Sequence, residues 1–245
     1  MEVHAHTQTE RKKWTHYFWE FLMLFLAVFC GFLAEYQLEH VIENRREKQY
    51  IRSLIEDLKQ DTAQITAAVN IRLLREKQLD SLIRLLKSEN RNKFVNEIYY
   101  FARYSSRQTF FFVNADRTIQ QLKHSGGLRL IRNQSASDNI MSYDASVRFI
   151  QNRENIESTV LDNYRNIVEN IFDASVFQSM IEGALITRPK GNLKLFNENL
   201  HEINRLCIQA HYLYAGSIVN RGYQADMKNA AEKLIVFLKK EYHLE

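Results

Sequence analysis

The stretch YFWEFLMLFLAVFCGFLAEYQL, residues 17–38, decides how the chain is organised. Its inner part, residues 21–34, contains no charged or strongly polar side chain. A membrane-spanning helix needs about 20 mainly apolar residues, and the wider window supplies them if Glu20 and Glu35 lie near the two membrane interfaces. These glutamates are 15 positions apart, which is about 22 Å along a helix. The sequence therefore predicts a transmembrane helix over residues 17–38.

Three other interpretations of this stretch compete with a true span, which we favour. A cleaved signal peptide fits the basic residues before it, but Phe32 two positions before Ala34 breaks the small-x-small cleavage pattern. A lipoprotein signal needs a small residue before Cys30, where Phe29 stands. A buried helix of a soluble protein usually keeps a polar stripe, whereas nearly every face of residues 21–33 is apolar.

The composition predicts an all-α protein. Seven glycines and one proline are few for 245 residues, and compact sheet proteins need frequent turns that favour both residue types. The formal net charge of +4 comes from 33 basic and 29 acidic side chains, and the two signs are interleaved as on solvated helix faces. Because no basic block or stripe is evident, we expect no nucleic-acid partner.

We expect three parts along the chain. They are a short cytoplasmic tail (residues 1–16), a single transmembrane helix (17–38) that continues into a long helix, and a helical bundle domain (39–245). Basic residues lie on both sides of the span, but the cluster at residues 11–13 is denser and nearer to the chain start. Basic residues favour the cytoplasmic side. This predicts a cytoplasmic N-terminus, with most of the chain outside the cytoplasm.

A heptad seam follows the span, with no proline or glycine between the two. Apolar or small residues recur there in steps of 4 and 3, the spacing of a coiled-coil seam. These residues are Ile51, Ile55, Leu58, Thr62, Ile65 and Val69. The next apolar residues are Leu79, Leu82, Ile83 and Leu86. They look like a shifted seam, so we expect a kink or register change near Asn70 and a first turn over residues 88–92.

The rest of the sequence predicts further helices joined by few loops. The expected helices cover residues 94–103, a segment that ends at Lys123, a long segment that begins at Ser137 or Asp138, and residues 196–242. The last of these is expected to be one helix or a pair bent between Gly216 and Gly222. Residues 109–113 (TFFFV) have no partner strands, so we expect a buried helix or connector there. Residues 188–191 form the clearest loop.

Candidate catalytic and metal-binding residues are few. Cys207 and His211 lie four apart on one helix face with His201 nearby, but zinc normally needs three or four such ligands, and packing roles fit these residues better. Residues 125–127 (SGG) lack the spacing and the lysine of a phosphate-binding loop, and a helix C-cap explains them. We therefore predict no catalytic residue, no metal site and no cofactor.

Two segments carry a resemblance to a known family. The first comprises Glu20-Phe-Leu-Met-Leu with Ala27, Gly31 and Glu39, followed by Lys48, Tyr50, Leu54, Asp57-Leu58 and Asp61; the second is residues 122–133 (LKHSGGLRLIRN) with Tyr143. Together they resemble uncharacterised single-span membrane proteins common in Bacteroidota, which carry a helical domain outside the cytoplasm. Glu35-Tyr36 departs from that family, which tends to have Asn and then Trp. The resemblance implies a bacterial inner-membrane protein with a periplasmic domain, and it implies no activity.

These observations lead to the hypothesis of a membrane-anchored, non-enzymatic helical module that binds a partner or senses a signal at the bacterial envelope. The alternatives are a small homo-oligomeric pore lined by the span and, less favoured, a membrane-bound enzyme. The expected partners are the lipid bilayer and either further copies of the chain or other membrane proteins.

Ala27, Gly31 and Glu35 are spaced by four residues and predict a helix-association face, because small residues at this spacing let two helices approach closely. The heptad seam can either extend that contact or pack on later helices of its own chain. Glu20 adds a pH-sensitive group, because carboxylates clustered near a bilayer edge would resist joint ionisation and share protons.

Overall fold

The computed structural model describes residues 14–107, 112–124 and 126–244. They belong to two compact units, Met1–Gln49 and Tyr50–Glu245. The described residues are almost all helical, and two short strands are the exception, so the all-α prediction is confirmed.

The described part of the first unit is the beginning of helix α1, which extends from Trp14 to Lys87. An 18-residue window of this helix has a mean hydropathy of 2.0, and none of the window is buried. The core helix of a soluble protein would be mostly buried, so this exposure argues against that interpretation. The expectation of an N-terminal helix long and apolar enough to cross a membrane is confirmed.

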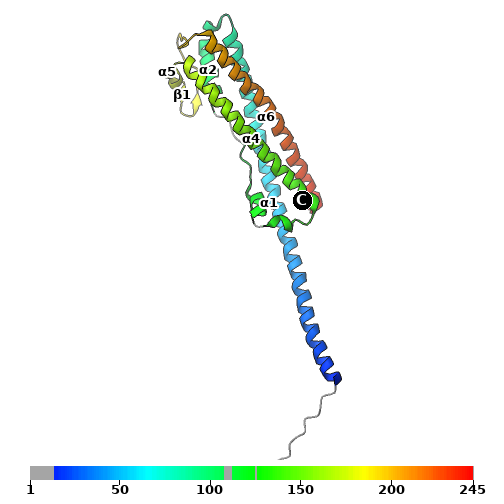
Figure 1. The fold of residues 1–245 in the computed structure, drawn as a ribbon. Helices are drawn as coiled ribbons and strands as arrows, with labels where there is room; N and C mark the ends of the chain where they lie inside the picture. Colours follow the sequence, from blue (N-terminus) through cyan, green and yellow to red (C-terminus); the bar gives the residue numbers. More distant parts are fainter. Residues whose placement is uncertain (1–13, 108–111, 125, 245) are drawn as a thin grey trace, which may run out of the picture. The chain divides into compact units, whose positions relative to one another are not determined.

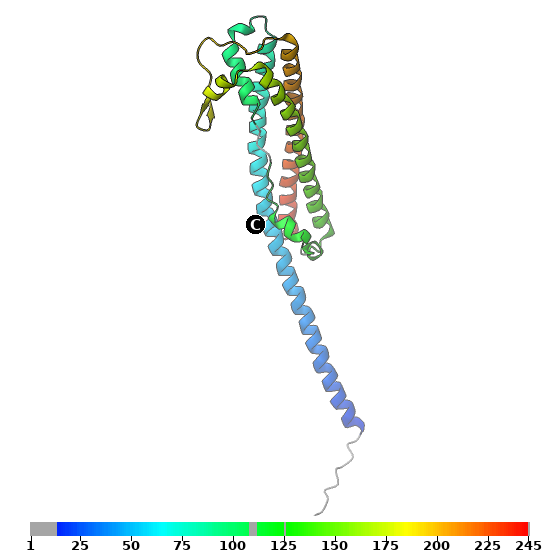
Figure 2. The same ribbon diagram turned by 60° about the vertical axis from the view of Figure 1, so that its left-hand side comes forward.

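Three long helices form the second unit: α1 from Tyr50 onward, α4 (Gln134–Ile171) and α6 (Leu200–Glu241). Figures 1 and 2 show all three side by side along their lengths, as in a helical bundle. The shorter elements are η1 (Arg91–Lys93), α2 (Val95–Ser105), α3 (Arg117–His124), η2 (Gly127–Leu130), α5 (Ala174–Ser179), β1 (Ile181–Glu182) and β2 (Leu185–Ile186). The two strands pair in an antiparallel hairpin.

The heptad seam of α1 continues past Asn70 without a break. After Ile65, buried residues recur in steps of 3 and 4 as far as Leu86. The residues at these steps are Ala68, Arg72, Arg75, Leu79, Leu82 and Leu86, and Glu76 and Gln78 beside them are buried as well. The predicted register change is therefore wrong. The buried positions just after Asn70 are occupied by arginines and not by apolar residues. The helix and the 3-and-4 spacing of its buried positions continue through them.

Two other predicted helix boundaries need correction. Helix α4 begins at Gln134, because the Asn133 side chain caps it by accepting a hydrogen bond from the backbone N–H of Ala136 (3.0 Å); the predicted start was Ser137 or Asp138. Helix α6 begins at Leu200, later than the predicted residue 196, and continues without interruption through Gly216 and Gly222, so of the two structures expected there the single helix is the one observed.

The short predicted segments agree better with the structure. Helix α2 covers the predicted 94–103 region, and α3 ends one residue after Lys123. Of the 109–113 segment, residues 109–111 lie outside the described residues. Phe112 is buried and, like Val113, has no regular secondary structure. This part is a connector, one of the two structures expected.

Two hydrophobic clusters build the core of the bundle. One contains the buried apolar residues within 79–86 of α1, 161–171 of α4 and 203–213 of α6. The other contains those within 51–65 of α1, 136–150 of α4 and 227–238 of α6. Between the two clusters all three helices bury polar and charged side chains, and this polar layer is the first candidate site.

Candidate functional site

The predicted helix-association face is exposed in the structure. Ala27, Gly31 and Glu35 all lie on α1 with exposed side chains or backbone. A Cβ atom added at Gly31 would meet no heavy atom within 4 Å, so this face is open to a neighbour. Glu20 is also exposed. Its Oε1 atom lies 3.0 Å from Nε2 of His16.

The heptad seam is used within the chain. Ile51, Ile55, Leu58 and Ile65 are almost completely buried and belong to the cluster that includes α4 and α6 residues. Of the two roles considered for the seam, the structure supports packing on the chain's own later helices. These buried side chains are consequently not available to a second copy of the chain.

The polar layer is centred on two buried arginines of α1. Arg72 donates from Nη1 to Glu157 Oε2 (2.6 Å), and Arg75 donates from Nη1 to Glu157 Oε1 (2.7 Å). All three side chains are more than nine-tenths buried. One carboxylate of α4 thus receives a guanidinium hydrogen bond on each oxygen, and such charge-assisted bonds are the stronger kind.

Helix α6 completes the same layer with amide side chains. Asn220 donates from Nδ2 to Glu157 Oε2 (2.7 Å). Gln224 accepts from Arg72 Nε (3.0 Å) and donates to Glu154 Oε1 (3.2 Å). Because buried polar groups are costly unless they are hydrogen-bonded, these bonds hold the three helices in one mutual register.

A second group of bonds extends the layer along the α1–α6 side. Glu76 Oε1 accepts from Ser217 Oγ (3.2 Å) and from Arg221 Nε (3.0 Å). Glu76 and Ser217 are buried, while Arg221 is half-buried. The charges in the layer are therefore matched within the domain itself.

Three carboxylates hold the connector that precedes α3 and the start of α3 itself. Glu154 accepts from the backbone N–H of Phe112 (3.1 Å), Asp61 from that of Ala115 (2.7 Å), and Asp57 from that of Thr118 (3.1 Å). The connector lacks regular structure at the first two of these positions. Side-chain carboxylates thus take the place of the sheet or helix partners that backbone N–H groups otherwise need.

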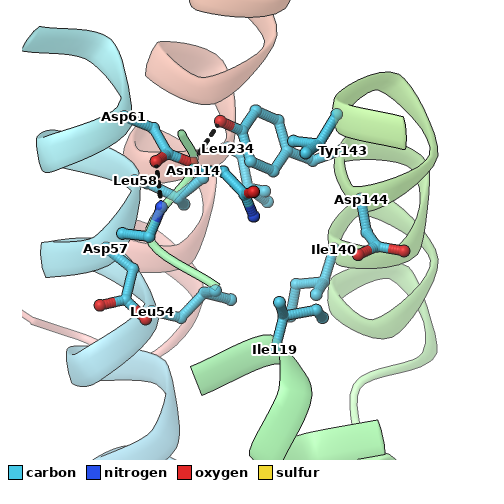
Figure 3. Close-up of a pocket in the computed structure, with 12 residues that line it drawn as sticks. Leu54, Asp57, Leu58, Asp61, Asn114, Ile119, Ile140, Tyr143, Asp144 and Leu234 are labelled. Carbon is cyan, nitrogen blue, oxygen red and sulfur yellow. Dashed lines mark hydrogen bonds between the residues drawn. The ribbon is translucent and has the colours of Figure 1, made fainter. Parts of the chain in front are cut away.

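A small cavity lies beside Asp61, lined by residues from α1, the connector, α3, α4 and α6. Figure 3 shows the Asp61 carboxylate between two donors, the Tyr143 hydroxyl and the backbone N–H of Ala115. The Tyr143 hydroxyl donates to Asp61 Oδ2 at 2.7 Å. Asp57 and Asp144 also line the cavity, and the remaining walls are largely aliphatic.

Burial dominates the electrostatics of this site. It raises the pKa of Asp61, although the hydrogen bonds from Ala115 and Tyr143 act in the opposite direction. Burial and the neighbouring Asp61 charge also raise the pKa of Tyr143. The hydroxyl therefore stays protonated at neutral pH and acts as a hydrogen-bond donor.

The two glutamates that α4 contributes to the polar layer, Glu154 and Glu157, differ in the direction of their pKa shifts. Burial raises the pKa of Glu154, against the effects of the Phe112 N–H and Arg72. Burial acts in the same way on Glu157, but the charges of Arg72 and Arg75 outweigh it, and the pKa of Glu157 is lowered. Glu157 is therefore the more firmly ionised of these two.

The arrangement gives little room for a substrate. The cavity beside Asp61 has a volume of about 20 Å³, which is enough for about one water molecule. Within the ranges that the structure describes, no group of three or more His, Cys, Asp or Glu side chains could hold a metal ion. Cys207 is buried, and burial raises the pKa of its thiol, whereas His201 and His211 are exposed.

Comparison of the chain with protein-family models, with curated proteins and with solved structures gave no match.

Hydrophobic periodicity alone does not predict the polar layer. Arg72, Arg75 and Glu157 look like members of solvated helix faces when only hydrophobic periodicity is followed. A usable signal was present, however: the 4-and-3 steps of the seam, continued from Val69, arrive at Arg72 and Glu76. Charged residues at successive seam positions indicate a buried polar layer.

Proposed function

We propose that this chain is a membrane-anchored, non-enzymatic helical module that binds a partner or senses a signal at the bacterial envelope. The observation that carries the proposal is the 18-residue window of α1, which combines a mean hydropathy of 2.0 with no buried residue. So large an apolar surface is rarely left open to water in a soluble monomer. A bilayer is the surrounding that removes it from water over the whole circumference of the helix.

The positions of charged residues around the window support a single pass. Glu20 and Glu35 stand near its two ends, where an ionised group costs far less than the roughly 2.5–3.5 kcal/mol of an Asp at the bilayer centre. The aromatic residues Trp14, Tyr17 and Trp19 gather at its N-terminal edge, as in an interfacial belt. The likeness to single-span Bacteroidota membrane proteins supports the same topology.

The proposed location is the bacterial inner membrane, with the helical domain in the periplasm. The basic cluster at residues 11–13 favours a cytoplasmic N-terminus. Residues 39–245 then lie on the periplasmic side. In this arrangement the domain meets other envelope proteins, and a signal passes through them or through a change in association between copies.

The absence of enzymatic activity is also a proposal, and the internal pairing of the polar groups supports it. An active site needs a titratable group that can reach a substrate. Glu157 is fully engaged by Arg72, Arg75 and Asn220, and the cavity beside Asp61 holds about one water. The buried carboxylates thus have structural partners that account for them.

Carbonate extraction of membranes tests the anchor. The full-length chain is expected to stay in the membrane pellet, and Val28→Arg, which places a charge near the middle of the apolar window, should shift the chain toward the supernatant. The control is Gln60→Arg on an exposed position of the second unit. Release of the wild-type chain, or a mature chain that starts after Ala34, would contradict the proposal.

A reporter fused after Glu245 tests the orientation. A reporter that is active only in the periplasm should be active. Activity from a cytoplasm-only reporter at the same position would reverse the topology and would make a cytoplasmic partner the better proposal.

A further inference from the structure

An open cleft lies at the end of the bundle where the second unit begins and α6 ends. Its walls come from residues 52–59 of α1, from Arg117 at the start of α3, and from Lys239 to Leu244. Its volume is about 620 Å³, within the roughly 300–1,000 Å³ range of small-molecule sites. Three segments that are far apart in the sequence thus meet around one open space.

The charged side chains around this cleft are mostly basic. Arg52, Lys59, Arg117 and Lys239 line it together with His243, against a single carboxylate, Glu56. The whole chain has 33 basic and 29 acidic residues, which are nearly equal numbers. The excess of basic side chains around the cleft therefore does not follow from the composition alone. The cations come from α1, α3 and α6, which distinguishes the cluster from the solvated face of one helix.

Two of the cations have no counter-ion among the described residues. Lys59 pairs with Glu56 (2.8 Å) and Arg117 with Asp57 (3.5 Å). The side chains of Arg52 and Lys239, in contrast, make no ion pair or hydrogen bond with any described residue. Like charges gathered around a cleft repel one another, and a bound anion would remove this repulsion.

We propose that this cleft binds a phosphate-bearing anion, either a phosphorylated small molecule or the headgroup of an anionic phospholipid. A phosphate group offers several oxygens at once, so it can accept hydrogen bonds from the surrounding side chains. The guanidinium groups of Arg52 and Arg117 suit paired contacts with phosphate oxygens, and Lys239 adds a point charge. The volume leaves space for the rest of a small molecule or headgroup beside the phosphate.

Calorimetric titration with inorganic pyrophosphate tests the proposal on the purified full-length chain in a neutral detergent. Pyrophosphate should bind the wild type, and its affinity should fall as salt is added, because exposed charges are screened over about 8 Å at physiological ionic strength. Arg52→Gln with Lys239→Gln should weaken the affinity at least about tenfold, as expected when charge-assisted hydrogen bonds are removed. The matched control, Lys77→Gln with Lys190→Gln, removes the same charge from exposed positions outside the cleft.

A second arm, in mixed micelles that contain phosphatidylglycerol, separates the two sources of phosphate. If a lipid headgroup is the ligand, the apparent affinity for pyrophosphate falls in these micelles, and native mass spectrometry finds phosphatidylglycerol on the wild type but much less on the Arg52/Lys239 double variant. If a soluble anion is the ligand, the affinity is the same with and without the lipid. The proposal is overturned if neither probe binds, or if the double variant and its control, both folded by circular dichroism, lose affinity equally.

Discussion

At the scale of single residues, Glu157 is the buried carboxylate whose ion pairs matter most for the stability of the domain. It is buried between Arg72 and Arg75 and also accepts from Asn220. Removing one partner of a buried ion pair leaves the other charge uncompensated, which is far more costly than the net value of the pair. The stability of the bundle should therefore be unusually sensitive to this side chain.

We predict that Glu157→Ala lowers the free energy of unfolding by about 3–5 kcal/mol. The reason is that two buried guanidinium groups would lose the carboxylate that accepts from both. Urea unfolding of the full chain in detergent, followed by circular dichroism, measures the change. The control is Asp162→Ala on the same helix, whose pair with Arg165 is exposed and should contribute about 1 kcal/mol or less. Equal effects of the two substitutions would contradict the buried network.

Asp61 allows a test by pH, because its pKa is raised by burial. A carboxyl group with a raised pKa in the folded state binds a proton more tightly there than in the unfolded chain. Its contribution to stability is fully present below the unfolded pKa of about 4 and is lost as the pH rises through the folded pKa. Acidification from neutral pH should thus increase this one contribution.

The corresponding prediction concerns the difference in unfolding free energy between the wild type and Asp61→Asn. That difference should change in favour of the wild type as the pH falls from about 7 to about 4. Asp173→Asn is the control of opposite sign, because hydrogen bonds from Ser175 lower the pKa of Asp173, so its contribution is lost on acidification. Parallel pH profiles for both variants would show that Asp61 has no raised pKa.

At the scale of the helices, periodicity predicted most of the fold but not its polar interior. The apolar spacing of α1 from Ile51 to Ile65 identified its buried face. The same rule failed at Arg72 and Arg75, because it treats every charged residue as exposed, and only the tertiary pairing with Glu157 makes their burial possible. The 3-and-4 spacing of buried positions continues through this part of α1, but charged side chains replace apolar ones there.

The candidate site was harder to predict for a related reason. The carboxylates of Asp61 and Glu154 bind backbone N–H groups of a connector that is distant in sequence, and Asp57 binds one at the start of α3. No local spacing rule indicates such a contact, because neither the course of the connector nor the donors follow from periodicity. The start of α4 is a simpler case: Asn133 is a strong N-cap residue, but the sequence-based prediction puts the helix start later, at Ser137 or Asp138.

The glycines of α6 provide a prediction for this element. Gly216 and Gly222 lie inside a continuous helix, and a Cβ at either position would meet no atom within 4 Å. Gly216→Ala and Gly222→Ala should each stabilise the domain by about 0.5–1 kcal/mol, because glycine is a poor helix former. In contrast, Gly126→Ala and Gly191→Ala should destabilise it by about 1–2 kcal/mol, since these glycines have φ values of 66° and 96°. Urea midpoints of the four variants check both signs.

For the molecule as a whole, the two units make opposite use of apolar side chains. The bundle from Tyr50 onward buries its apolar residues in two clusters on either side of the polar layer. The helix before it leaves its apolar window entirely exposed. Because the heptad seam is occupied inside the bundle, an association between copies would use other surfaces, and the exposed face at Ala27, Gly31 and Glu35 offers one.

The last prediction is that the chain self-associates through this face. Small residues four apart let two transmembrane helices approach closely, so crosslinking in native membranes should give discrete oligomers. Gly31→Leu should reduce them several-fold, and the loss would arise between chains, because a Cβ at Gly31 meets nothing within its own chain. Leu33→Phe, which enlarges a side chain about 200° around the helix from Gly31, is the control and should leave the oligomers unchanged. A wild-type chain that stays monomeric both in membranes and across dilution in mild detergent would exclude self-association, and the homo-oligomeric pore with it.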